Sequence, residues 1–125
     1  MLKLSIFVFL GSGLGGVCRF LASAYIGRIA GGAGMFPYGT FAVNIVGCFL
    51  IGLIYAAVDR GVPMSPETKT FLTAGFCGGL TTFSTFSHEN YLLFHAQGLP
   101  TVALYTVLSL AIGFTAAWFG HAIMR

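Results

Sequence analysis

Four long apolar segments follow one another along the chain, separated by short stretches that collect glycine, proline and charged residues. The segments cover approximately residues 4–26, 40–58, 68–94 and 100–124. A helix needs about 20 residues to cross the hydrocarbon core of a bilayer, so each segment is long enough to span a membrane once. The pattern predicts an all-α membrane protein in which residues 1–125 form one domain of four transmembrane helices.

The third segment differs from the others because glycines and hydroxyl-bearing residues interrupt it between residues 75 and 82. Lipid offers no partner for unpaired backbone groups, so a helix that breaks at membrane depth must line protein or a watery path. In transport proteins such breaks mark ion and substrate sites. We therefore expect a broken third helix with the functional chemistry around the break.

Composition supports the membrane assignment. Hydrophobic residues make up 57% of the chain and charged residues 7%, with a mean hydropathy of +0.91. A soluble domain carries about 25% charged residues, so this chain cannot cover a water-facing surface and its natural partner is the lipid bilayer. The net charge of +3 is thinly spread. No basic run is present that would indicate nucleic-acid binding.

The distribution of basic residues bears on orientation. Four spans put both termini on one side of the membrane, and positive charge near the helix ends decides which side faces the cytoplasm. Four basic residues against two is a weak bias, which permits insertion in both orientations. The four on the terminal side are Lys3, Arg60, Lys69 and Arg125, and the two on the other are Arg28 and Arg19.

A bundle of four helices can scarcely surround a pore and also shield it from lipid, so a homodimer is the natural completion. Two GxxxG pairs, Gly11 with Gly15 and Gly75 with Gly79, suit close contacts between transmembrane helices. The sequence leaves open whether these contacts form between two copies or within one subunit.

Enzyme motifs are incomplete in this chain. Residues 11–16 match GxGxxG, but a dinucleotide site needs an acid about 20 residues further on, and the first acid here is Asp59. His88 and Glu89 begin an HExxH zinc motif that fails because position 92 is leucine. With no nucleophile–base pair or metal cluster, the sequence predicts a protein that is not an enzyme.

Several polar residues lie inside the apolar segments. Asn44 lies in the second, where a polar residue is commonly functional; its amide could donate to an anion or to a broken helix, or could join two helices. Arg19 lies deep in the first, where it either extends to the nearer interface or faces the bundle and attracts anions. Tyr105 and Ser109, four apart, form a hydroxyl ladder or bond back to their own helix.

Aromatic and hydroxyl side chains alternate just after the break. Phe83 and Phe86 share one helical face, and Ser84 and Thr85 lie between them. Aromatic rings are positive at their edges, so ring edges and hydroxyl donors together suit an anion path without full positive charges. Unwound carbonyls at the break would instead suit a hard cation such as Na⁺, and two symmetry-related copies would supply four oxygens.

Three sequence motifs, at residues 15–20 (GGVCRF), 39–49 (GTFAVNIVGCF) and 75–86 (GFCGGLTTFSTF), resemble those of the Fluc (CrcB) family of fluoride channels. Their order and spacing cover nearly the whole chain, although Gly113 stands where the family can carry a further hydroxyl. The resemblance implies an antiparallel, dual-topology homodimer with two parallel fluoride pores and a central structural Na⁺. It also implies a multi-pass protein of the bacterial inner (plasma) membrane that exports F⁻ passively and lowers cytoplasmic fluoride.

The candidate site residues follow from the polar pattern and from the resemblance together. The Na⁺ site is expected to use the backbone carbonyls of Gly78 and Thr81, and the vestibule is expected to contain Arg19 and Glu89. The fluoride pore is expected to involve Asn44, Phe83, Ser84, Thr85, Phe86, Tyr105 and Ser109.

A small multidrug-resistance transporter is the alternative, since it is also a four-span dimer. Proton-coupled exchange of cationic drugs needs a carboxylate embedded in the membrane. The first span has none, and Glu89 follows the break near a helix end.

Overall fold

The computed structural model describes residues 1–30 and 36–124, and within them all regular structure is helical. This confirms the all-α prediction. The elements are α1 (Leu2–Ile29), α2 (Tyr38–Asp59), α3 (Pro66–Thr70), the π-helix η1 (Phe71–Cys77), α4 (Gly78–Leu80), α5 (Ser84–Gln97) and α6 (Leu99–Ile123).

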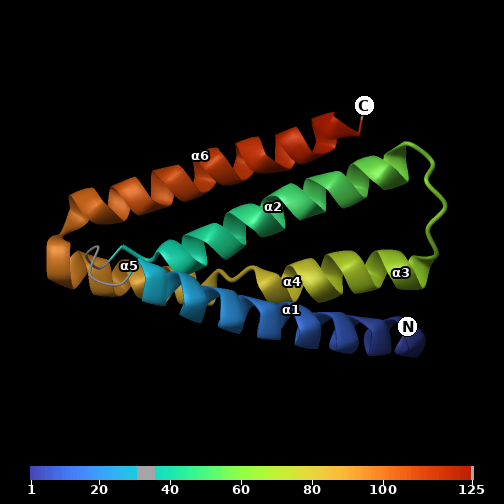
Figure 1. Cartoon of the computed structure of the whole chain (residues 1–125), viewed down its shortest axis with the longest axis horizontal. Coiled ribbons are helices and arrows are strands. Elements are labelled where there is room, and N and C mark those ends of the chain that lie inside the picture. Colours follow the sequence, from blue (N-terminus) through green and yellow to red (C-terminus); the bar gives the residue numbers. More distant parts are fainter. Residues whose placement is uncertain (31–35, 125) are drawn as a thin grey trace.

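Three of these helices, α1, α2 and α6, are long and apolar enough to cross a membrane. The third pass along the chain is composite: α3, η1 and α4 run continuously, and α5 follows after a short non-helical stretch at residues 81–83. Both termini lie at the same end of the bundle (Figure 1). The four passes therefore alternate in direction.

The break lies later than the sequence predicted. Residues 75–80 remain helical, and only residues 81–83 leave helical geometry, whereas the prediction spread the break over residues 75–82. The reason is tertiary packing, which overrides the weak helix propensity of glycine. A Cβ at Gly75 would lie 2.9 Å from the Cα of Gly11, so the glycine permits helix contact and does not unwind the chain.

Both GxxxG pairs work within one subunit, which resolves the alternative that the sequence left open. A Cβ at Gly11 would lie 2.8 Å from the Cα of Gly75, and a Cβ at Gly15 would clash with the carbonyl oxygen of Phe76. A Cβ at Gly79 would clash with α1 in turn. Small residues thus bring α1 into backbone contact with η1 and α4.

The α2–α6 contact also depends on glycines. A Cβ at Gly52 would clash with the carbonyl oxygen of Ala117, and a Cβ at Gly120 with that of Phe49. At the end that holds the termini, Lys3 pairs with Glu67 on α3 at 3.3 Å. At the opposite end, Gly98 (φ 84°) is the only residue between α5 and α6.

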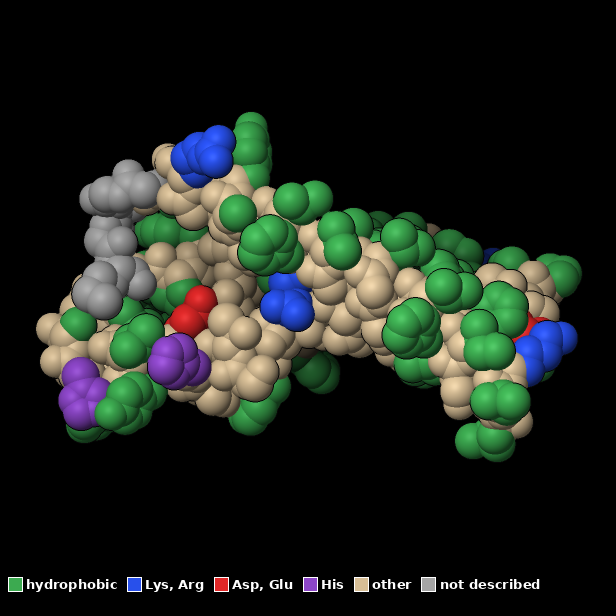
Figure 2. All heavy atoms as spheres, turned by 90° about the horizontal axis from the view of Figure 1, so that it is seen from below, with side chains coloured by type: hydrophobic (Ala, Val, Ile, Leu, Met, Phe, Trp, Pro, Cys, Tyr) green, Lys and Arg blue, Asp and Glu red, His purple; other side chains and the backbone are tan. Residues whose placement is uncertain are grey.

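Large apolar side chains cover most of the outer surface of the spans. Phe9 on α1 is 77% exposed and Phe114 on α6 is likewise 77% exposed. Hydrophobic side chains spread along one face of the molecule, and charged side chains are few (Figure 2). Such a surface suits lipid rather than water.

Candidate functional site

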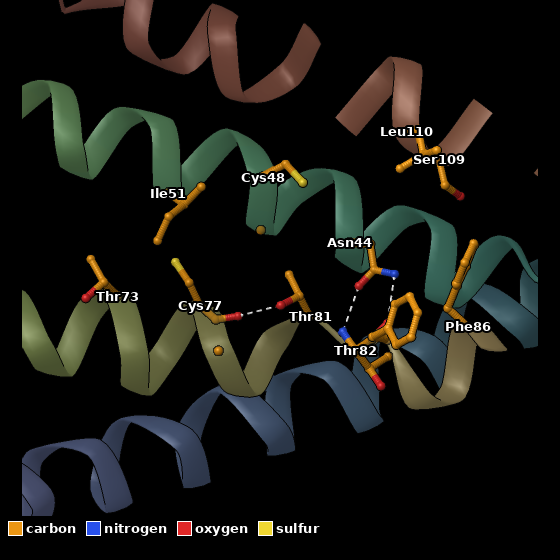
Figure 3. A pocket seen from close by; sticks show the side chains of 13 residues that line it. Asn44, Cys48, Ile51, Thr73, Cys77, Thr81, Thr82, Phe86, Ser109 and Leu110 are labelled. Carbon is orange, nitrogen blue, oxygen red and sulfur yellow. Dashed lines mark hydrogen bonds between the residues drawn. The ribbon is translucent and has the colours of Figure 1, made fainter. Parts of the chain in front are cut away.

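The break in the third pass is fastened to α2 by a side-chain amide. Asn44 donates from Nδ2 to the carbonyl oxygen of Thr82 (3.2 Å), and the backbone N–H of Thr82 donates to Asn44 Oδ1 (2.8 Å), as Figure 3 shows. The Asn44 side chain therefore satisfies both backbone groups of Thr82 where no helical partner is present. Its amide nitrogen carries a second hydrogen that is available to a ligand.

This arrangement frees two backbone carbonyls. In an α-helix the carbonyl of residue i accepts from the N–H of residue i+4. The Thr82 N–H that would serve Gly78 donates to Asn44, and the Thr85 N–H that would serve Thr81 donates to Thr82 Oγ1 at 3.3 Å. Both carbonyls of the predicted cation site have thus lost their usual donors. Gly78 is nevertheless helical, so the expectation that unwinding releases its carbonyl is wrong for that residue.

An open groove of about 560 Å³ borders the break. Figure 3 shows Asn44 and Cys48 on α2 on one side, Cys77 and Thr81 on the other, and Ser109 of α6 nearby. The Oγ atom of Ser109 is buried and has no hydrogen-bond partner among the described residues. The groove thus combines unsatisfied polar atoms with an apolar lining. Its lining residues are Asn44, Gly47, Cys48, Ile51, Thr73, Cys77, Gly78, Thr81, Thr82, Phe83, Phe86, Ser109 and Leu110.

The two phenylalanines differ in their surroundings. Their ring centroids are 6.0 Å apart. Phe86 packs against Tyr105 at 4.8 Å, whereas Phe83 is 78% exposed. Phe86 is therefore held by its own subunit, and Phe83 is free to contact something outside it.

Hydroxyl groups surround the start of α5. Thr82 Oγ1 lies 3.4 Å from the Oγ atom of the exposed residue Ser84. It also accepts a hydrogen bond from the backbone N–H of Thr85. The structure thus brings Ser84 and Thr85 to the break as predicted from their positions.

Tyr105 is fully buried, and its hydroxyl donates to Glu89 Oε1 at 2.9 Å. The structure therefore does not bring the Tyr105 hydroxyl and Ser109 together on one lining, because Tyr105 lies behind Phe86. Thr40 donates to the other carboxylate oxygen of Glu89 at 2.7 Å. Thr40 is a residue that the sequence analysis missed; the signal was a hydroxyl at the start of an apolar span.

A second cavity, of about 330 Å³, lies on the other side of Thr82. Arg19 and Glu89 both line it, but they form no ion pair in the described part of the chain. Arg19 donates from Nε to the carbonyl oxygen of Gly79 at 2.9 Å. The side chain is therefore held toward the bundle and does not extend to the interface. The cavity is lined by Arg19, Phe20, Ser23, Ala24, Thr40, Thr82, Thr85 and Glu89.

Thr82 borders both the groove and the cavity. Residues predicted as pore and residues predicted as vestibule therefore meet at one threonine, directly beside the amide of Asn44. Polar groups of α1, α2, α5 and α6 are thus arranged around a single interruption in an otherwise apolar bundle.

Comparison of the sequence with known proteins shows the family to which the chain belongs. The profile of CrcB-like proteins, described as "Camphor Resistance (CrcB)", matches residues 6–121. The chain belongs to the CrcB family. A CrcB relative from Flavobacterium psychrophilum, named fluoride-specific ion channel FluC, is 40% identical over 124 residues, covering 99% of this chain and 98% of its own.

Other relatives have the same name and a similar extent. One from Geotalea daltonii is 43% identical over 120 residues, covering 96% of this chain and 95% of its own. One from Acidobacterium capsulatum is 39% identical over 118 residues, covering 94% and 93%. Both are named fluoride-specific ion channel FluC. The similarity therefore spans the whole bundle and not only the break.

Proposed function

We propose that this protein is a channel that conducts fluoride passively through the polar break of its third pass, and that it is not an enzyme. The observation that carries the proposal is the fastening of Thr82 by Asn44, which holds amide and hydroxyl donors beside aromatic rings at one groove. The proposal agrees with the names of the CrcB relatives, which are ion channels.

The chemistry of this site suits a small, strongly hydrated anion. Fluoride leaves water only where other donors replace nearly all its hydrogen bonds. The second amide hydrogen of Asn44 and the unpartnered hydroxyl of Ser109 supply such donors, and the edge of the Phe86 ring supplies a partial positive charge. None of these groups carries a full charge, so the ion is bound weakly enough to leave.

The proposed direction of transport is export from the cytoplasm. In an acidic medium, hydrogen fluoride enters the cell as a neutral molecule. It then ionises in the less acidic cytoplasm. A passive channel then lets the anion leave down its own gradient, helped by the negative potential of the interior. We propose that the protein lies in the bacterial inner (plasma) membrane, where such export needs no energy source.

We further propose an antiparallel homodimer with two fluoride pores. Two features of the single subunit support it. The Phe83 ring comes directly after the most polar segment of the span and is 78% exposed at the groove. The subunit itself therefore leaves this large apolar ring uncovered. Gly78 is exposed there too, and a Cβ on it would meet nothing closer than 3.8 Å, so packing within the subunit does not require a glycine. Both features suit close approach of a second copy.

A structural Na⁺ at the centre of this dimer is part of the proposal. Gly78 and Thr81 of each copy would hold it through the carbonyls that have lost their helical donors. Carbonyl oxygens are suitable ligands for a hard cation. When bound, the ion would hold the two interrupted spans against each other, without taking part in conduction.

The alternative, a proton-coupled drug exchanger, fits less well. Such a transporter needs a membrane-embedded carboxylate that exchanges protons and cations. Here Glu89 accepts hydrogen bonds from both Thr40 and Tyr105, so its two oxygens are already engaged.

Efflux from liposomes that contain the purified protein tests the proposal. Fluoride should leave rapidly and chloride should not. Asn44→Asp should slow fluoride efflux because it puts a negative charge beside the anion path. Equal release of both halides, or unchanged efflux from the variant, would contradict the proposal. Drug exchange in the same liposomes would favour the alternative.

A further inference from the structure

The helix α5 has two faces of different character. Its inner face packs on the bundle: Phe86 contacts Tyr105, Asn90 donates to Thr106 Oγ1 at 3.3 Å, and Leu93 is 1% exposed. The opposite face carries exposed polar side chains at helical spacing, with the exposed apolar residues Leu92 and Phe94 on either side of them. We call this set the outward stripe. It consists of Ser84, Ser87, His88, Tyr91 and His95, all exposed.

The rings of the outward stripe follow one another along the helix. The rings of His88 and Tyr91 are stacked, with centroids 6.4 Å apart. Those of Tyr91 and His95 meet edge to face at 4.5 Å. Among the described residues, these three side chains have no hydrogen-bond partner. Their polar atoms therefore face outward and are available to water or to a ligand.

The depth of the stripe makes its polarity unusual. α6 has 25 residues and is therefore about 37 Å long, so it exceeds the hydrocarbon core of about 30 Å by a few ångströms at each end. His88 lies ten residues before Gly98, where α5 turns into α6, which places it about 15 Å along the axis from that end. With α6 centred in the bilayer and parallel to its normal, the imidazole of His88 lies about 11 Å inside the hydrocarbon boundary.

The neighbouring surfaces at the same depth are apolar. Val107 on α6 is nine residues from Gly98 and 61% exposed, and Leu104 is 53% exposed. Figure 2 shows histidine side chains gathered near one end of the face that it draws, while hydrophobic side chains are scattered along the rest of that face. Polar side chains uncovered in lipid are costly, so something other than lipid must cover the stripe.

Two features favour water over a protein partner as the cover. The stripe begins beside the break, since Ser84 Oγ lies 3.4 Å from Thr82 Oγ1, and it continues to the aqueous end of α5. Helix faces that pair in membranes are enriched in small residues that permit close approach. The stripe instead carries three rings, which suit the wall of an open passage.

We propose that the outward stripe of α5 lines a water-filled vestibule by which a small hydrated anion reaches the break. The inference rests on the proposed fluoride channel, because it adds an entry route to the same site. The hydroxyls of Ser87 and Tyr91 and the N–H of His88 donate hydrogen bonds along the route. They exchange with the ion's hydration water before it meets Asn44.

Thiol labelling in liposomes tests the vestibule without relying on transport. His88→Cys and Tyr91→Cys are compared with Val107→Cys and Leu104→Cys, which are matched in depth on α6. A sulfonated, membrane-impermeant maleimide is supplied on both sides, and peptide mass spectrometry assigns the label, so the native cysteines stay in place. Thiols react as thiolates in water, so labelling at 88 and 91 should be about tenfold or more faster than at the controls.

The results separate cleanly. Labelling at 88 and 91 no faster than at the controls would overturn the proposal and show that lipid or a second copy covers the stripe. Rapid labelling with a several-fold loss of fluoride efflux, caused by the added sulfonate charge, would support it. Rapid labelling that leaves efflux unchanged would remove the stripe from the fluoride route. Absence of fluoride efflux from the unaltered protein would instead contradict the proposed function and leave the labelling comparison intact.

Discussion

Substitution of Asn44 by alanine tests how the break is held. In the structure one side chain satisfies both the N–H and the carbonyl of Thr82, at 2.8 and 3.2 Å. Alanine removes both bonds and leaves two backbone groups without partners at membrane depth. We expect the break to lose its geometry and fluoride efflux to fall.

The magnitude follows from the two bonds. A hydrogen bond between transmembrane segments contributes about 0.6 kcal/mol on average, which gives a lower bound near 1 kcal/mol for the pair. A buried backbone group left unsatisfied costs about 1–3 kcal/mol, so the loss is about 2–6 kcal/mol if neither group finds a new partner. Each 1.4 kcal/mol lowers the equilibrium constant between the intact and the altered break about tenfold, and once the altered state dominates, fluoride efflux falls by the same factor.

Asn90→Ala is the matched control. It also removes an amide from a helix in the bundle, but it breaks only the 3.3 Å bond to Thr106 and leaves no backbone group unpaired. The assay measures initial fluoride efflux from liposomes together with the melting temperature of the purified protein. Asn44→Ala should lower both quantities and Asn90→Ala should change them little. Equal effects of the two substitutions, or wild-type efflux from Asn44→Ala, would refute the role assigned to Asn44.

Three further predictions concern packing, the groove and the carboxylate. Gly15→Ala should destabilise the protein by about 1–3 kcal/mol because its Cβ would clash with a backbone carbonyl of η1. Gly16→Ala should be neutral or slightly stabilising because nothing lies within 4 Å of its Cβ. Thermal melting in detergent distinguishes the two variants, and equal shifts in melting temperature would contradict the α1 packing. Phe83→Ile should change the stability of the subunit by less than about 0.5 kcal/mol, because the ring is 78% exposed, yet slow fluoride efflux about tenfold by removing a ring edge; unaltered efflux would exclude the ring from the path. Tyr105→Phe removes the 2.9 Å bond to Glu89 and keeps the ring contacts, so it should lower stability by about 1.5–3 kcal/mol, and an unchanged melting temperature would show that this bond contributes nothing.

The spans could be predicted from sequence because bilayer thickness fixes the length of an apolar helix. The position of the break could not. The sequence assigned Gly75 and Gly79 both to the break and to a GxxxG contact; the structure confirms the contact, because they let α1 approach η1 and α4 and the helix continues through them. Which role a glycine has depends on a helix more than 50 residues away in the chain.

The residue types of the candidate site could be predicted from the sequence, but not which residues form hydrogen bonds with each other. Asn44 and Thr82 are 38 positions apart, and nothing local to either indicates that they bond. Thr40 was overlooked for the same reason, since its partner Glu89 lies 49 positions away. The opposite faces of α5 became visible only once the structure showed which side of the helix packs.

The most direct test of passive fluoride conduction is a reversal-potential measurement on the purified protein in a planar bilayer, with a fluoride gradient and equal chloride on both sides. A fluoride channel predicts a current that reverses at the Nernst potential of fluoride and does not move when a proton gradient is added. Reversal near zero, or at a potential that follows the proton gradient, would contradict the account.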